Sequence, residues 1–201
     1  EVPLHPTVEK HYVELPEPSL EDQRADADRL LDALKERVEP EIEVLRDLPA
    51  TLRRGQYKVT AVTAEGRLVA VEPGDTVKAN YGVAFDVGTT TVVCYLLDLT
   101  QGRELAVSSC ANPQIPLGHD VISRIRHAEK MEGLIELQRR IVEGLNDLIA
   151  DCCRQARVAS DQLHEATFVG NTTMSQLFLG INPAFLAQAP YVASHRAAVN
   201  L

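Results

Sequence analysis

Several features that would narrow the function are absent from this sequence. The chain has four cysteines, Cys94, Cys110, Cys152 and Cys153. They form no C-x-x-C pair, and no histidine stands at zinc-ligand spacing, so we expect no metal site held by cysteines. No apolar run approaches the ~18 residues that span a bilayer, and no signal-peptide pattern is present. We therefore expect buried thiols in a reducing cytoplasm and no membrane contact.

Clustered positive charge is also missing. Residues 1–79 carry 17 acidic and 11 basic side chains, and residues 80–201 carry 12 acidic and 9 basic ones. Nucleic-acid binding needs grouped Lys and Arg to neutralise phosphates, so we expect no nucleic-acid partner. The net charge of −9 serves solubility.

The turn-rich stretch at 73–80 marks a boundary between two differently patterned regions, which we take as domains 1–77 and 80–201. In the first, we expect an edge strand at 8–15, a helix over 20–38 capped by Ser19, and a short strand followed by a helix from about Pro49. Two further strands flank a Glu65-Gly66 turn. This region predicts a small α+β domain, which is either a spacer or docking module or a purely structural domain.

The second region predicts an α/β domain with the order β-β-β-α-β-α. Strands are expected at 81–87, 90–98 and 103–110, followed by helices at 120–130 and 133–157, a strand at 165–171 and a last helix. On the helix at 120–130 we expect Ile122 to face the core. For Arg124 and Arg126 on the same helix we favour a solvated face, with contact to phosphate or to an acidic partner as the alternative.

The turn "DVGTTT", which begins at Asp86, breaks an otherwise apolar pair of strands. Glycine allows a close backbone turn, successive N–H groups in such a turn attract anions, and hydroxyls add donors. A carboxylate at the strand end suits Mg²⁺ through water. The alternative is a plain hairpin turn with β-branched threonines. The later strand also ends in a polar loop, "VGNTTM", and two such ends favour a phosphate-binding cleft. Neither a P-loop nor G-x-G-x-x-G is present.

Three stretches together carry a more specific resemblance. "DVGTTTVVCYLLDLTQG" resembles the first phosphate loop of the actin-like ATPases, and the β-β-β-α-β-α order is that of the first half of their ribonuclease-H-like fold. "NPQIPLGHDVISRI" and "FVGNTTMSQLFLG" narrow the resemblance to the ATP-dependent reductive activators of corrinoid proteins. In that family a ferredoxin domain precedes a linker, a small middle domain and a large actin-like domain. The resemblance implies that residues 1–77 are the linker and the small middle domain, and that residues 80–201 are the incomplete N-terminal part of the actin-like domain.

The resemblance implies reductive activation of cob(II)amide to cob(I)amide on a partner corrinoid protein, driven with the help of Mg-ATP. It implies that Asp86 holds Mg²⁺ through water and that Gly88, Thr89 and Thr90 surround the β- and γ-phosphates. Thr91, which begins the next strand, completes this side of the cofactor site. It places Gly170, Asn171, Thr172 and Thr173 on the facing side, where a helix N-terminus also favours an anion. For Asn112, Gln114 and Asp120 it suggests cleft or partner contacts, with turn and N-cap roles as the alternative.

Parts of the family pattern are missing from the chain. The ferredoxin cysteine motif is absent, so we expect the 2Fe–2S cluster in another part of a longer parent protein. The second phosphate loop and the adenosine pocket are also absent, so we expect this chain alone to be inactive and to bind ATP weakly. A homodimer is a further candidate assembly. The alternatives are an actin-like sugar or acid kinase, or a non-catalytic docking module whose loop only stabilises the fold.

Overall fold

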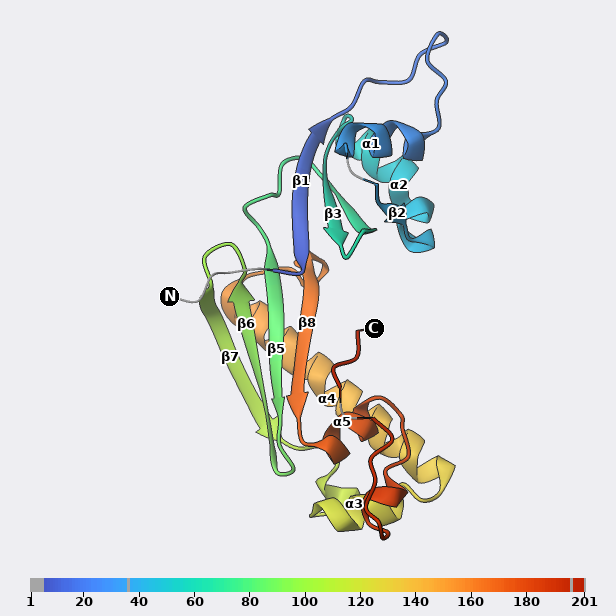
Figure 1. Ribbon diagram of the computed structural model, residues 1–201. Coiled ribbons are helices and arrows are strands. Elements are labelled where there is room, and N and C mark those ends of the chain that lie inside the picture. Colours follow the sequence, from blue (N-terminus) through green and yellow to red (C-terminus); the bar gives the residue numbers. More distant parts are fainter. Residues whose placement is uncertain (1–5, 36, 196, 201) are drawn as a thin grey trace. The chain divides into compact units, whose positions relative to one another are not determined.

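The computed structural model describes residues 6–35, 37–195 and 197–200. The chain divides into two compact units. The first comprises residues 1–81 with the short segments 98–102 and 162–165, and the second comprises the remainder. Each unit has its own four-stranded sheet (Figure 1). The predicted α/β class is confirmed.

The first unit contains a sheet with the strand order β1-β3-β4-β2 and two helices. The strands are β1 (Val8–Glu14), β2 (Glu39–Pro40), β3 (Lys58–Ala64) and β4 (Arg67–Pro73), and the helices are α1 (Asp26–Leu34) and α2 (Ile42–Arg54). β3 and β4 form the predicted hairpin. Glu65 and Gly66 both have positive φ, 50° and 79°, as a turn matched to the strand twist requires.

Two helix predictions in this unit are wrong in extent. The first helix begins at Asp26 rather than near residue 20, because Ser19 makes a local turn and its Oγ accepts from the N–H groups of Glu21 and Asp22. The expected strand before Pro49 is instead the first half of α2, and Pro49 lies inside that helix. Burial of Leu48 and Leu52 on one face of α2, each at most 2% exposed, outweighs the backbone hydrogen bond that proline cannot donate.

The second unit contains a sheet with the order β7-β6-β5-β8. Its strands are β5 (Tyr81–Val87), β6 (Thr91–Asp98), β7 (Arg103–Ala111) and β8 (Leu163–Gly170). The helices are α3 (Val121–His127), α4 (Met131–Ala156) and α5 (Thr172–Phe178), with short 3₁₀ turns η1 (Ile115–Leu117), η2 (Ser160–Gln162) and η3 (Ala184–Leu186). In Figure 1 the arrowheads of β5 and β8 point the same way, as the helical crossover through α4 predicts.

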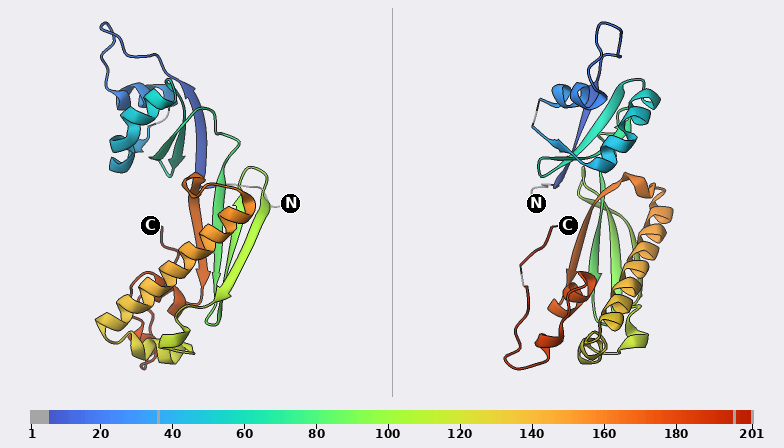
Figure 2. Two further views of the ribbon diagram at one scale, coloured as in Figure 1. Left: turned by 180° about the vertical axis from the view of Figure 1, so that it is seen from behind. Right: turned by 90° about the vertical axis from the view of Figure 1, so that its right-hand side faces the viewer.

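Helix α4 covers one face of this sheet (Figure 2). Alternate residues of β5 and β6 are buried, as expected for strands with one face on a helix. The helix supplies an apolar stripe at helical spacing, Leu134, Leu137, Ile141, Leu145, Leu148 and Cys152. The Sγ of Cys152 lies 3.6 Å from the carbonyl oxygen of Cys94 in β6. This packing fixes the strand ends at which the polar loops begin.

Candidate phosphate-binding loop

The turn between β5 and β6 is closed by a short backbone hydrogen bond. The N–H of Gly88 donates to the carbonyl of Thr91 at 2.9 Å. A Cβ on Gly88 would lie 2.9 Å from that same carbonyl oxygen, so no larger residue fits here without moving the turn. The glycine that the sequence singled out is therefore needed for close approach of the backbone.

Three successive carbonyls of this turn accept hydrogen bonds from Asn112 and Arg124. The Nδ2 of Asn112 donates to Gly88 at 2.8 Å, the Nη2 of Arg124 donates to Thr89 at 2.5 Å, and the backbone N–H of Asn112 donates to Thr90 at 2.8 Å. In a trans peptide the N–H of the next residue points opposite to the carbonyl. The N–H groups of Thr89 and Thr90 are thereby turned away from Asn112 and Arg124.

These two N–H groups have no acceptor among the residues that the structure describes. Thr90 is exposed and Thr89 is partly exposed, so the free donors lie at the surface of the second unit. Adjacent free N–H groups in a turn attract an anion. The geometry therefore suits a phosphate oxygen at the turn.

Asp86 is the exposed residue near the end of β5, two positions before Gly88. Its neighbours Phe85 and Val87 are buried, so strand alternation directs the carboxylate to the opposite side of the sheet from α4. Thr91 is exposed at the start of β6. A hard oxygen ligand beside free N–H groups is the combination that a metal-bound phosphate requires.

The second polar loop meets the first. The Nδ2 of Asn171 lies 3.4 Å from the Oγ1 of Thr89, which brings together two stretches 82 residues apart. The Oδ1 of Asn171 also caps α5 by accepting from the N–H of Met174 at 3.0 Å. A Cβ on Gly170 would lie 3.2 Å from the carbonyl of Val87, so glycine permits β8 to approach the end of β5.

The two threonines after Asn171 differ in position. Thr172 is exposed, whereas Thr173 is 5% exposed and lies on the buried side of α5. Because α5 is only seven residues long, the expected contribution of its N-terminus to anion binding is small.

A buried polar network lies beneath the phosphate loop. Asn112 and Gln114 are each 1% exposed and Arg124 is fully buried. The Oδ1 of Asn112 accepts from the N–H of Gln114 at 2.9 Å, and the Nε2 of Gln114 donates to Leu137 of α4 at 2.9 Å. The structure thus places Asn112 and Gln114 behind the loop, where they support its backbone and contact their own chain.

The sequence prediction for Arg124 is wrong, since it placed this residue on a solvated face. Its guanidinium donates to the carbonyl of Gly118 at 2.8 Å and to the Oε1 of Gln114 at 3.2 Å. Ile122, expected in the core, is instead 49% exposed. Arg124 stands four residues before buried Ala128 and shares its helix face, but this spacing alone does not predict that a guanidinium is buried there.

Asp120 caps α3 and does not lie in this network. Its carboxylate accepts from the N–H of Ser123 at 2.8 Å, and the N–H of Asp120 donates to the Oγ of Ser123 at 3.2 Å, which completes a capping box. The pKa of the Asp120 carboxyl is lowered, mainly by the hydrogen bond from the N–H of Ser123. The N-cap alternative therefore describes the Asp120 side chain.

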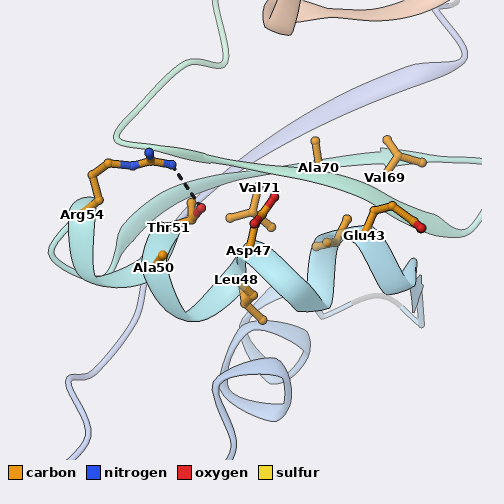
Figure 3. Close-up of a pocket in the computed structure, with 10 residues that line it drawn as sticks. Glu43, Asp47, Leu48, Ala50, Thr51, Arg54, Val69, Ala70 and Val71 are labelled. Atoms are coloured by element: carbon orange, nitrogen blue, oxygen red, sulfur yellow. Dashed lines mark hydrogen bonds between the residues drawn. The ribbon is translucent and has the colours of Figure 1, made fainter.

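A separate hollow of about 410 Å³ lies in the first unit between α2 and β4 (Figure 3). Glu43 and Asp47 stand at its rim, and Arg54 donates to the Oγ1 of Thr51 at 3.2 Å. The adjoining edge of β4 is interrupted by a bulge opposite Val62 and Thr63 and ends at Pro73. Both features discourage the addition of a further strand at this edge.

The sequence matches two known family models, which together cover almost the whole chain. Residues 81–201 match the family described as the RACo middle region, and residues 1–78 match the RACo linker region. The chain belongs to the RACo family. Within it, the chain is 37% identical over 149 residues to the corrinoid activation enzyme RamQ of Eubacterium limosum, covering 73% of this chain and 25% of that protein.

A solved structure supports the same assignment. The fold matches the reductive activator for corrinoid, iron-sulfur protein with a TM-score of 0.79 and 33% sequence identity, over 96% of this chain and 32% of that one. This RACo-family chain therefore spans about a quarter to a third of the length of the relatives it matches. In the part of the chain that the structure describes, no helix is both long and apolar enough to cross a membrane.

Proposed function

We propose that this chain is part of an ATP-dependent reductive activator that converts cob(II)amide to cob(I)amide on a partner corrinoid protein. A reduced 2Fe–2S cluster would supply the one electron that this conversion needs. We assign that cluster to a ferredoxin-like domain elsewhere in the longer protein, since the ferredoxin cysteine motif is absent from this sequence. The names of the relatives support the activator over a sugar or acid kinase.

Within that protein, the second unit would bind the phosphate groups of Mg-ATP at the turn after β5. The observation that carries this proposal is the pair of free N–H groups at Thr89 and Thr90, held outward by Asn112 and Arg124. Asp86 would hold Mg²⁺ through water, and Asn171 would contribute an amide from the facing loop. Bound Mg²⁺ would neutralise phosphate charge, which the protein's own donors then orient.

The test is a calorimetric titration of the full-length protein with Mg-ATP, with and without Asp86→Ala. Loss of one charge-assisted contact is expected to weaken binding by about 1.5–3 kcal/mol. Asp147→Ala is the matched control, because Asp147 is an exposed carboxylate on α4. Equal affinities for all three proteins would show that the turn is structural only. Formation of cob(I)amide, followed by absorbance, should fall with the Asp86 variant in the same assay series.

A further inference from the structure

Arg124 is a fully buried cation without a buried counter-charge. Four acceptors surround its guanidinium: the carbonyls of Gly118 and Thr89, the Oε1 of Gln114, and the Sδ of Met174 at 3.2 Å. All four are neutral. Among the described residues no carboxylate oxygen forms an ion pair with it, whereas the other buried arginine, Arg29, pairs with Asp22 at 2.6 Å.

Two effects act on the charge of Arg124 in opposite directions. Burial lowers the pKa of the guanidinium, and Asp120 at the start of α3 raises it. Asp120 is itself exposed and engaged with Ser123. Proteins normally pair a buried charge, because an unpaired one costs several kcal/mol of desolvation. A neutral amide could also donate to the carbonyl of Thr89, whereas an anion bound near the loop would in addition give this buried charge a partner.

The short contact with Thr89 connects this charge to the free donors. The Nη2 of Arg124 lies 2.5 Å from the carbonyl oxygen of Thr89, and the other end of that peptide group is the N–H of Thr90. A cation at the carbonyl polarises the peptide and strengthens the N–H as a donor. The same bond fixes the direction in which that N–H points.

We propose that Arg124 is a positioning residue for the phosphate groups of ATP: it holds the Thr89–Thr90 peptide with its N–H outward and supplies, from beneath the loop, the positive charge that balances the bound anion. This inference rests on the proposed nucleotide site. It adds a residue that lies outside the two phosphate-loop stretches, in the segment 112–125 between them. Arg124 does not touch the phosphate in this arrangement and acts through the peptide group and its field.

The experiment compares Arg124→Met, Arg124→Lys and Asn112→Ala in the full-length protein, with circular dichroism as the check on folding. Affinities for Mg-ATP, Mg-ADP and adenosine are measured by calorimetry. Arg124→Met is expected to weaken Mg-ATP at least about tenfold, or about 1.4 kcal/mol, to weaken Mg-ADP less, and to leave adenosine within about twofold. Arg124→Lys should recover most of the loss. Asn112→Ala, which removes a neutral support from the adjacent carbonyl, should change Mg-ATP and Mg-ADP by the same factor.

The outcomes separate this inference from the proposed function. Wild-type protein that does not bind Mg-ATP would refute the site itself. Wild-type binding with no charge-dependent loss in Arg124→Met, or no recovery in Arg124→Lys, would refute only the role of Arg124. Should Arg124→Met not fold, Arg124→Gln replaces it, because its amide can still donate to Thr89 while the charge is removed; Mg-ATP affinity equal to that of wild type would then refute the role of Arg124.

Discussion

The buried ion pair between β1 and β4 of the first unit makes a quantitative prediction. The Nζ of Lys10, whose side chain is 1% exposed, donates to both oxygens of Glu72 at 2.8 and 2.9 Å and to the carbonyl of Ala79 at 2.6 Å. The Nε2 of His164 lies 2.7 Å from Glu72, and the hydroxyl of Thr76 donates to it as well. Glu72 is thus the common acceptor of three side chains.

These contacts set the ionisation of Glu72. Burial alone raises the pKa of this carboxyl, but the hydrogen bonds from His164, Lys10 and Thr76 outweigh burial and lower the pKa from 4.5 to about 2. A shift of that size corresponds to roughly 3 kcal/mol of folding free energy at neutral pH. Because the folded pKa is depressed, this stability is present above pH ~4.5 and is lost as the pH falls toward 2.

The perturbation is Glu72→Gln, which keeps the shape and leaves Lys10 buried without a counter-charge. At pH 7 we expect the free energy of unfolding to drop by about 3 kcal/mol, and at pH 3 by about 1 kcal/mol, since by then most of the wild-type advantage has been titrated away. The assay is urea unfolding followed by circular dichroism, with hydrogen exchange of β1 and β3 amides to localise the effect to the first unit.

Glu14→Gln provides the matched control for this prediction. Glu14 pairs with Lys58 at 3.7 Å, and both side chains are more than half exposed, so the expected change is below about 1 kcal/mol. A loss in Glu72→Gln that is the same at pH 7 and pH 3, or no larger than in the control, would refute the assignment of the pH dependence to Glu72.

Three further predictions concern the second unit. Gly118→Ala would place a Cβ 2.9 Å from the Cγ of Arg124 and should lower stability by about 1–3 kcal/mol in chemical denaturation; unchanged stability would mean that the contact relaxes freely. Leu137→Ala should cost about 2–5 kcal/mol, because Leu137 is fully buried, whereas Ile135→Ala on the same helix, at 56% exposed, should cost much less in the same measurement. Burial raises the pKa of Cys94 to about 12, so iodoacetamide at pH 8 should not modify it in the folded chain, as judged by peptide mass spectrometry; rapid labelling would contradict its burial.

Local patterns in the sequence predicted much of the fold. Alternating apolar residues placed β5, β6 and β7 within about one residue of their observed bounds, and helical spacing placed α4, because each of these elements packs on its neighbours in the way its own periodicity demands. Pro49 led to a wrong start for α2, because proline's effect on a helix was judged from local sequence alone. The burial of Leu48 and Leu52 against the sheet, which stabilises the helix through Pro49, is a tertiary effect.

Part of the candidate site could likewise be predicted from local sequence, and part depends on tertiary contacts. The turn at Asp86 and the loop at Asn171 could be read from their residue types, and the structure brings them into contact at Thr89. The burial of Arg124 could not, because it depends on segments that are distant in sequence: the turn itself, the Gln114 segment and Met174 of α5. A charged side chain among apolar residues on a helix is usually solvated, so only tertiary contacts reveal such an exception.

The inward carbonyls of Gly88, Thr89 and Thr90 have a consequence for the thermodynamics of ligand capture. A flexible glycine-containing turn would have to surrender conformational entropy each time it closed around an anion, and that loss would be subtracted from the affinity. Here the backbone is already fixed by hydrogen bonds formed during folding. The ordering cost therefore falls on the stability of the unit, and the turn is preorganised for an incoming anion before any ligand arrives.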